Sequence, residues 1–326
     1  MGGMTALEWP LCAPTGYVRN IIPVATSARH SAWCISWGEA QRQSIYSDPL
    51  YLDGYYDVVN APPKTGLAAA RMAALLTYRT RDSFESRFGR KTQLKAKTVG
   101  NSGVLTPPES PRTPAHHALA VHNDGHRGSQ RSPSSAAVTP RSQSVTNSES
   151  AANIQEQPKP SIFAAQSYLR YQGDKFTARF DANCYIHISR KLDTHDLARN
   201  RIALPSPHTP EDEIEALHKA LSMLPPGALV ISIQTDGLFT PSEQHEIASY
   251  IPGASLVTIS SSDGHDGFLL EFEAINQHVL GFLHERLPEI YTGVPADPRA
   301  VQGEGEDFEI KKTSMFGEAE ADITRW

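Results

Sequence analysis

Residues 228–267, which read ALVISIQTDGLFTPSEQHEIASYIPGASLVTISSSDGHDG, decide the fold. Residues 228–233 are apolar and predict a buried strand, and residues 255–259 predict a second one. Between them, residues 240–243 form a capping box with proline at the first helical position, which predicts a helix to about Tyr250. Alternating strands and helices with short connections predict a parallel sheet with right-handed crossovers.

An acid and a histidine follow the two predicted strands. Asp236 lies just past the first strand and His265 just past the second, 29 residues later. Functional groups in parallel sheets gather at the carboxyl ends of strands, so the two side chains are expected within hydrogen-bond reach. A carboxylate held against an imidazole fixes its tautomer and stabilises the imidazolium. Taken alone, a solvated Asp-Gly turn and a surface histidine are the commoner explanation.

The remaining helices and strands are predicted from apolar spacing and helix caps. The clearest helix of the first half has the sequence KTGLAAARMAALLTYRT, and Thr209-Pro210 caps a later amphipathic helix. The ranges are helices at 4–11, 31–42, 64–80, 209–224 and 269–286, and a β-prone run at 17–25. Ile214, Leu217, Leu221 and Leu224 are expected on the apolar side of the helix from Thr209.

Composition excludes several protein classes. The chain has 326 residues and a net charge of −6, which gives no indication of a nucleic-acid partner or an anionic membrane surface. Its three cysteines form no CxxC pair, which favours mostly buried thiols over a disulfide framework or a zinc site. No apolar run approaches the roughly 20 residues that span a bilayer, and no secretion signal is evident. A cytoplasmic location is expected.

Residues 98–160 differ from their surroundings. They are rich in proline and serine and contain no Phe, Tyr or Trp, which predicts a disordered insert. Its Ser-Pro and Thr-Pro pairs could be phosphorylated, although an unconstrained surface loop is the commoner explanation. Its four histidines, at 116, 117, 122 and 126, are expected to be incidental and not metal ligands.

Several long stretches resemble the homoserine O-acetyltransferase family in its fungal form. SDGHDGFLLEF (262–272) is similar to the histidine motif of that family, and TDGLFTP (235–241) to its acid motif. YLRYQGDKFTARFDANCYIHISRKLDTHDLAR (168–199), ISWGEAQRQSIYSDPLYLDGYY (35–56) and TGLAAARMAALLTYRTRDSFESRFGR (65–90) resemble other parts of it. The resemblance covers nearly all of residues 1–97 and 161–326.

The resemblance implies an α/β-hydrolase core with an inserted helical lid. Residues 1–47 and 225–287 would belong to the core, with Asp236 as acid and His265 as general base of a Ser-His-Asp triad. Residues 48–97 and 161–224 would form the lid, with the 98–160 insert between them and a C-terminal tail at 288–326. The implied reaction is ping-pong transfer of acetyl from acetyl-CoA, a co-substrate, to L-homoserine, with no metal or bound cofactor.

The first residues depart from the family pattern. The nucleophile turn in that family reads roughly G-G-S-M-G-G-M, whereas this chain starts Met1-Gly2-Gly3-Met4. The resemblance therefore places the serine immediately before Met1 and makes the backbone nitrogen of Met1 an oxyanion donor. We expect a chain truncated just after the nucleophile, through a start at an internal methionine, and inactive as it stands.

Substrate contacts are also implied by the resemblance. Arg71 would pair with the carboxylate of homoserine and Asp266 with its amino group, and Tyr56 would line the same pocket unless Tyr55 does so. On the residues alone, Arg71 could be a solvated helix residue and Asp266 a helix cap. Asp181 and Asp196 are expected to make structural hydrogen bonds.

Three functions remain open. A relative of the same fold could acetylate serine or use succinyl-CoA for homoserine O-succinyl transfer, and the chain could be a non-catalytic remnant. The oligomeric state is also open, with a homodimer as one alternative.

Overall fold

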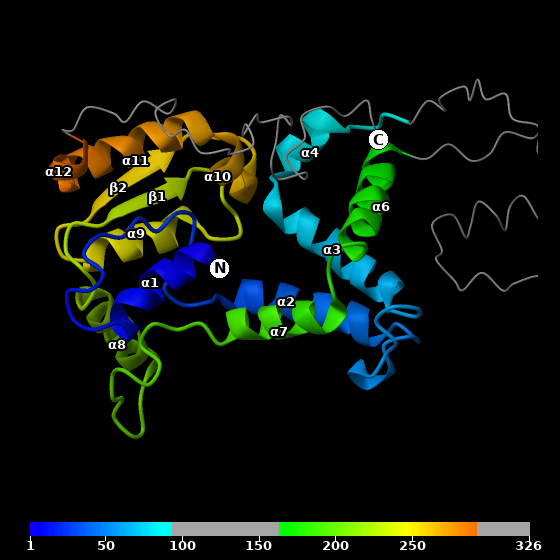
Figure 1. The fold of residues 1–326 in the computed structure, drawn as a ribbon, viewed down its shortest axis with the longest axis horizontal. Helices are drawn as coiled ribbons and strands as arrows, with labels where there is room; N and C mark the ends of the chain where they lie inside the picture. The colour runs from blue at the N-terminus through cyan, green and yellow to red at the C-terminus, as the bar shows by residue number, and fades with distance from the viewer. Residues whose placement is uncertain (93–162, 292–326) are drawn as a thin grey trace, which may run out of the picture.

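A computed structural model describes residues 1–92 and 163–291 of the protein. Its helices include two short 3₁₀ turns, η1 and η3, and its strands are β1 and β2 (Figure 1). In chain order the elements are α1 Gly2–Cys12, α2 Ala32–Tyr46, η1 Leu52–Gly54, α3 Lys64–Tyr78, α4 Arg81–Arg87, α6 Ala164–Thr177, α7 Ala182–Asp193, α8 Pro210–Ser222, β1 Leu229–Ile233, α9 Pro241–Tyr250, β2 Ser255–Ile259, η3 Gly264–Asp266, α10 Gly267–Leu270, α11 Phe272–Arg286 and α12 Pro288–Tyr291. The predicted insert and most of the tail lie outside the described residues.

Strands β1 and β2 are parallel, which confirms the predicted unit. They pair from Leu229 opposite Ser255 to Ile233 opposite Ile259. Every residue of β1 is buried, as expected for a strand covered on both faces. Figure 1 shows the pair between α9 and α11, which contact it from opposite sides.

The predicted strand at 17–25 is reduced to a short pairing with the free edge of β1. Leu229 N–H donates to the Ile21 carbonyl at 3.3 Å, and Ile231 N–H donates to the Pro23 carbonyl at 3.0 Å. Ala25 N–H returns a bond to Ile231 at 2.9 Å, and Val24 and Ile231 form a single parallel bridge. Pro23 has no N–H to donate, which limits the ladder.

Side chains of β1 alternate between two apolar clusters, as the period of two requires. Val230 packs on the side of α1, α8 and α9 together with Leu7, Leu221 and Ile247. Leu229, Ile231 and Ile233 pack on the other side, with Phe282 of α11. Apolar clusters therefore cover both faces of β1.

A second, helical layer lies beside the sheet (Figure 1). Helix α3 packs against α6 and α2, and α2 packs against α7. Helices α3 and α2 approach each other closely at Gly66, because a Cβ there would lie 2.6 Å from the Ser44 carbonyl oxygen. Helix α8, which falls in the predicted lid range 161–224, instead packs with the sheet layer through Leu217 and Leu221.

Most predicted helices are present. Three predictions from the sequence need correction: two concern helices and one concerns the cysteines. The helix expected at 269–286 is interrupted at Glu271, whose ψ of 39° separates α10 from α11. Ile214 of α8 is 48% exposed, so it does not belong to the apolar side. Cys34 is buried, but Cys12 and Cys184 are exposed, so the thiols are not mostly buried. None of the described helices could span a membrane.

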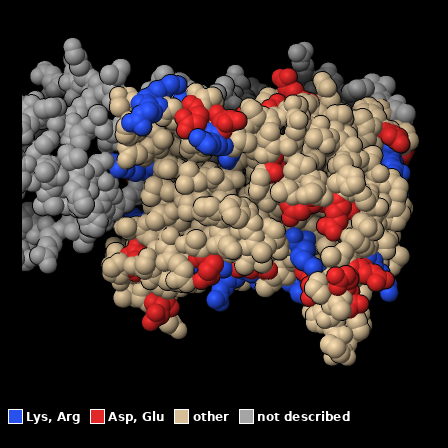
Figure 2. Space-filling view, turned by 180° about the vertical axis from the view of Figure 1, so that it is seen from behind, with Lys and Arg blue, Asp and Glu red and all other residues tan. Residues whose placement is uncertain are grey.

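Charges are interspersed on the face shown in Figure 2. Acidic and basic side chains lie next to one another there, with a wide area between them that carries neither. This mixture of both signs agrees with the modest net charge of −6.

Candidate active site

Asp236 is fixed by the turn that follows β1. Its side chain is fully buried, and Oδ1 accepts hydrogen bonds from the backbone N–H groups of Leu238 at 2.8 Å and Phe239 at 2.9 Å. The turn leads directly into the capping box at Thr240, where α9 begins. Local hydrogen bonds therefore set the position and orientation of the carboxylate.

His265 meets Asp236 as the sequence predicted. Its Nδ1 lies 2.7 Å from Asp236 Oδ2. A carboxylate only accepts, so Nδ1 carries the proton of this bond, and in the neutral imidazole Nε2 is then an acceptor. Thr235 joins the two loops, because its hydroxyl donates to the Ser261 carbonyl at 2.8 Å and accepts from Gly264 N–H at 3.0 Å.

The imidazole of His265 is enclosed by aromatic rings. Phe268 and Phe239 have ring centroids 5.0 and 5.2 Å from it, and Tyr78 has one at 6.3 Å. Only 14% of its side chain is exposed. Among the described residues no hydroxyl or thiol hydrogen-bonds to its Nε2.

The amino end of α1 lies at His265. A cavity of about 300 Å³ is lined by Met1, Gly2, Gly3 and His265 among others. Gly3 allows the segment that contains Thr26 to approach α1 closely, because a Cβ at Gly3 would lie 2.5 Å from Cβ of Thr26. The predicted oxyanion donor, the nitrogen of Met1, is thus at the start of a helix whose first residues line a cavity together with His265.

Arg71 and Asp266 line one cavity of about 370 Å³ together with His265 and Met1. Arg71 is buried on α3 with its guanidinium over the rings of Phe176 at 4.9 Å and Tyr78 at 5.4 Å. Asp266 does not cap α10 through its side chain. The structure therefore brings together four of the six predicted site residues in this cavity, and Asp236 lies directly behind His265.

Tyr56 lies elsewhere. Its hydroxyl donates to Asp181 Oδ2 at 2.5 Å and accepts from Asn183 N–H at 3.0 Å, at the start of α7. Burial, followed by the bond to Asp181, raises the pKa of Tyr56 to about 12. Tyr55 is 91% exposed. Tyr56 is thus not among the residues that line the cavity with His265, and its hydroxyl holds the cap of a helix; its predicted contact with the substrate stays a prediction.

Asp181 and Asp196 make structural bonds, as predicted. Asp181 caps α7 by accepting from Cys184 N–H at 3.0 Å. Asp196 forms an ion pair with Arg29 at 3.1 Å.

His30 is a cavity residue that the sequence did not indicate. It lines the same cavity as His265 and is 9% exposed. Burial is the largest influence and lowers the pKa of His30 to about 4, although nearby Asp193 opposes that change. Its Nδ1 has no hydrogen-bond partner among the described residues. Arg79, Asp263 and Thr235 were missed as well, because their partners lie on other elements.

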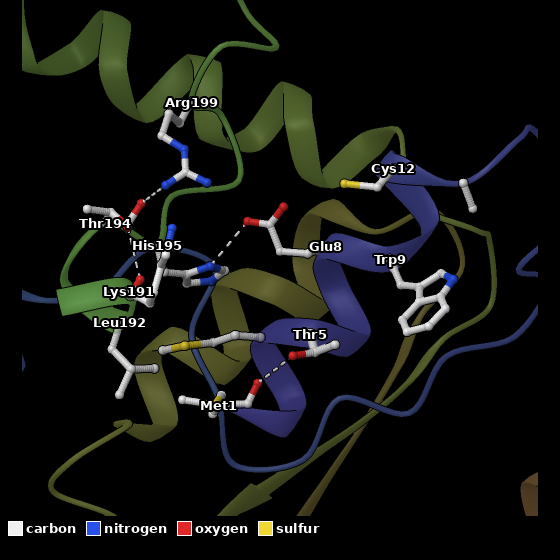
Figure 3. Close-up of a pocket in the computed structure, with 12 residues that line it drawn as sticks. Met1, Thr5, Glu8, Trp9, Cys12, Lys191, Leu192, Thr194, His195 and Arg199 are labelled. Atoms are coloured by element: carbon white, nitrogen blue, oxygen red, sulfur yellow. Dashed lines mark hydrogen bonds and ion pairs between the residues drawn. The ribbon is translucent and has the colours of Figure 1, made fainter. Parts of the chain in front are cut away.

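A further cavity, of about 560 Å³, runs along α1 (Figure 3). Glu8 of α1 points toward His195 across it, and Glu8 Oε1 is 3.3 Å from His195 Nδ1. His195 Nε2 is 3.0 Å from the Ser27 carbonyl, and Glu8 also pairs with Arg201 at 2.6 Å. These bonds tie α1 to the segment after α7. Neither His265 nor Asp236 lines this cavity, so we assign the Glu8–His195 contacts a structural role.

Comparison with known proteins gives consistent matches. A family model described as alpha/beta hydrolase fold matches residues 1–272. Homoserine O-acetyltransferase from Cryptococcus neoformans is 54% identical and covers 100% of this chain and 71% of its own length. The enzymes of that name from Emericella nidulans and Saccharomyces cerevisiae are 50% and 46% identical, and each match covers 100% of this chain and 67% of the relative.

Solved structures agree on the fold. The crystal structure of homoserine O-acetyltransferase from Bacillus anthracis superposes with a TM-score of 0.58 at 16% identity, over 86% of this chain and 57% of that one. Esterase E22 superposes with a TM-score of 0.55 at 19% identity, over 86% and 58% of the two chains. At these identities the likeness concerns the fold alone.

Proposed function

Because this chain belongs to the homoserine O-acetyltransferase family and has the α/β-hydrolase fold, we propose that it supplies the acid and histidine of an enzyme that transfers acetyl from acetyl-CoA to the hydroxyl of L-homoserine. One observation carries the proposal. His265 Nδ1 is 2.7 Å from the buried carboxylate of Asp236, and His265 faces a cavity that also holds Arg71 and Asp266.

His265 acts as the base in both half-reactions. Its Nε2 takes the proton of a serine as the serine oxygen attacks the thioester carbonyl of acetyl-CoA, and then gives that proton to the departing thiol. The acetyl group is left on the serine. Nε2 next takes the proton of the homoserine hydroxyl, which attacks the acetyl-serine, and returns it to the serine oxygen. Asp236 keeps the proton of the neutral imidazole on Nδ1 throughout.

The serine is proposed to lie directly ahead of Met1. The start of α1 and His265 line two cavities together, which supports placing a residue joined to Met1 near His265. In that arrangement the nitrogen of Met1 is a peptide N–H and donates to the oxyanion of each tetrahedral intermediate. The positive end of the α1 dipole stabilises the same charge.

Arg71 and Asp266 are proposed to hold the acceptor. A buried guanidinium matches the carboxylate of an amino acid in two parallel hydrogen bonds. A carboxylate has several lone-pair positions and can accept from an ammonium group while bonded to another cation. The two side chains together select an acceptor with both charges. No metal or bound cofactor takes part in the proposed reaction.

The test compares two proteins. One is purified residues 1–326. The other, called the extended protein below, carries ahead of Met1 the residues that precede the matching position in the Cryptococcus neoformans relative. We expect homoserine-dependent release of CoA from acetyl-CoA by the extended protein and none by residues 1–326.

Each other result contradicts part of the proposal. Acetyl transfer by residues 1–326 would show that a nucleophile lies within the chain. Faster turnover with serine or succinyl-CoA would replace the proposed acceptor or donor. An extended protein that is folded and inactive with all of these substrates would favour a non-catalytic role.

A further inference from the structure

Arg79 joins the end of α3 to the loop that carries His265. Its side chain is 5% exposed. Nε donates to Asp266 Oδ2 at 3.0 Å, and Nη1 donates to Asp263 Oδ1 at 3.0 Å. These aspartates stand one residue after and two residues before His265. One guanidinium thus bonds to the chain on both sides of the catalytic histidine.

Neighbours of Arg79 fasten the same loop. The Thr80 hydroxyl donates to the Ser262 carbonyl at 2.6 Å, and the Ser83 hydroxyl donates to Asp263 Oδ1 at 2.5 Å. Gly264 has φ +67°, and a Cβ there would lie 3.0 Å from Thr80 N and from the Tyr78 carbonyl oxygen. The loop therefore lies directly against the junction of α3 and α4, with no room between them for a larger residue.

We propose that Arg79 is a positioning residue that holds Asp266 toward the acceptor and fixes the backbone on both sides of His265. The inference rests on the proposed function for the roles of those two residues. The imidazole of His265 is already held at Nδ1 by Asp236, but that bond does not fix Asp266. Arg79 bonds directly to Asp266 and so restrains it.

The planar fork of arginine is essential to this role. Two nitrogens of one rigid group reach two carboxylates on separate residues, and each bond is charge-assisted. The single ammonium of a lysine reaches one carboxylate well and leaves the other. Without Arg79, Asp263 and Asp266 would stand beside His265 without the guanidinium that bonds to both of them.

A purely structural ion pair would behave differently. Its loss would lower the free energy of unfolding, but the folded fraction would retain its affinity for the acceptor. A positioning residue changes the affinity for homoserine in protein that is fully folded. The two roles are separated by steady-state kinetics on folded variants.

The kinetic experiment uses the extended protein with Arg79→Gln, Arg79→Lys and the matched control Arg81→Gln. Arg81 is exposed at the start of α4, two residues away, and its replacement removes the same charge. We expect both Arg79 variants to raise the KM for homoserine and to lower kcat/KM on the order of 100-fold. The burst of CoA release without homoserine should fall less, because His265 keeps its bond to Asp236. Arg81→Gln should match the parent.

A folded Arg79→Lys protein with the parent KM for homoserine would overturn the inference. If neither Arg79 variant folds, Arg79 is a stability residue and the inference is equally overturned. An extended parent that does not acetylate homoserine would refute the proposed function instead. In that case proton NMR of residues 1–326 decides. The backbone amide signals of Asp263, His265 and Asp266 should shift in Arg79→Lys and not in Arg81→Gln, because Arg79 bonds to the residues on both sides of His265, and unchanged signals would refute the role of Arg79.

Discussion

Asp236→Asn should abolish the first half-reaction while the protein stays folded. The carboxylate accepts three hydrogen bonds in the structure, from Leu238 N–H at 2.8 Å, Phe239 N–H at 2.9 Å and His265 Nδ1 at 2.7 Å. Asparagine has one acceptor oxygen, and its other terminal atom is a donor. The substitution therefore cannot preserve all three bonds.

The two orientations of the asparagine differ in free energy. If its oxygen faces His265, the two backbone N–H groups meet an NH₂ group, and each buried unsatisfied donor costs about 1–3 kcal/mol. If its oxygen faces the backbone, both N–H bonds persist and only the histidine must adapt. The second orientation is favoured. The NH₂ group then donates to Nδ1, and the proton of the neutral imidazole moves to Nε2.

An imidazole protonated on Nε2 cannot accept the proton of the nucleophile. The same exchange in a comparable serine triad lowers the rate about 10⁴-fold, which corresponds to roughly 5.5 kcal/mol of activation free energy. We expect a loss of this size in the burst of CoA release by the extended protein without homoserine. The burst is the right measurement because it reports acylation before any acceptor binds.

Asp181→Asn is the matched control. Asp181 is also an aspartate that accepts a backbone N–H, in this case that of Cys184 at the start of α7, and asparagine caps helices about as well. This variant should keep the parent burst. A folded Asp236→Asn protein with a burst rate within about tenfold of the parent would refute the tautomer argument.

Three further predictions concern the acceptor site, acid stability and packing. In the extended protein, Arg71→Lys and Asp266→Asn should keep the burst of CoA release and lose homoserine-dependent turnover, because a lost buried charge pair costs roughly 2–5 kcal/mol. A burst that vanishes would mean that these two residues support the triad or the fold instead of the acceptor. The pKa of His30 is lowered from 6.5 to about 4, so the unfolded chain binds more protons between these pH values and stability is lost as the pH falls through them. His30→Gln should therefore reduce the difference in urea-unfolding free energy between pH 7 and pH 4 by on the order of 3 kcal/mol, and an unchanged difference would contradict this. Gly66→Ala places a Cβ 2.6 Å from the Ser44 carbonyl oxygen and should destabilise the protein by about 1–3 kcal/mol, whereas Gly281→Ala, with no atom within 4 Å, should not.

The sequence by itself determined the local elements and the family. The capping boxes at Thr209 and Thr240 close within three residues, and β2 has the predicted bounds Ser255–Ile259. Such features depend on neighbouring residues, whose spacing can be read directly from the chain. The Asp236–His265 pair was predictable for a related reason, because one repeat of a parallel sheet brings successive strand ends together.

Only the tertiary structure decided which distant side chains meet. Arg79 and Asp266 are 187 residues apart and Tyr56 and Asp181 are 125 apart, and their contacts depend on how separate elements pack. The same holds for Ile214, which is exposed because no element covers its side of α8 in the described residues. Packing of one layer against another is fixed by shape and by the sum of many weak contacts. A single sequence carries no spacing that encodes such contacts, so neither the bond between Tyr56 and Asp181 nor the one between Arg79 and Asp266 could be predicted from it.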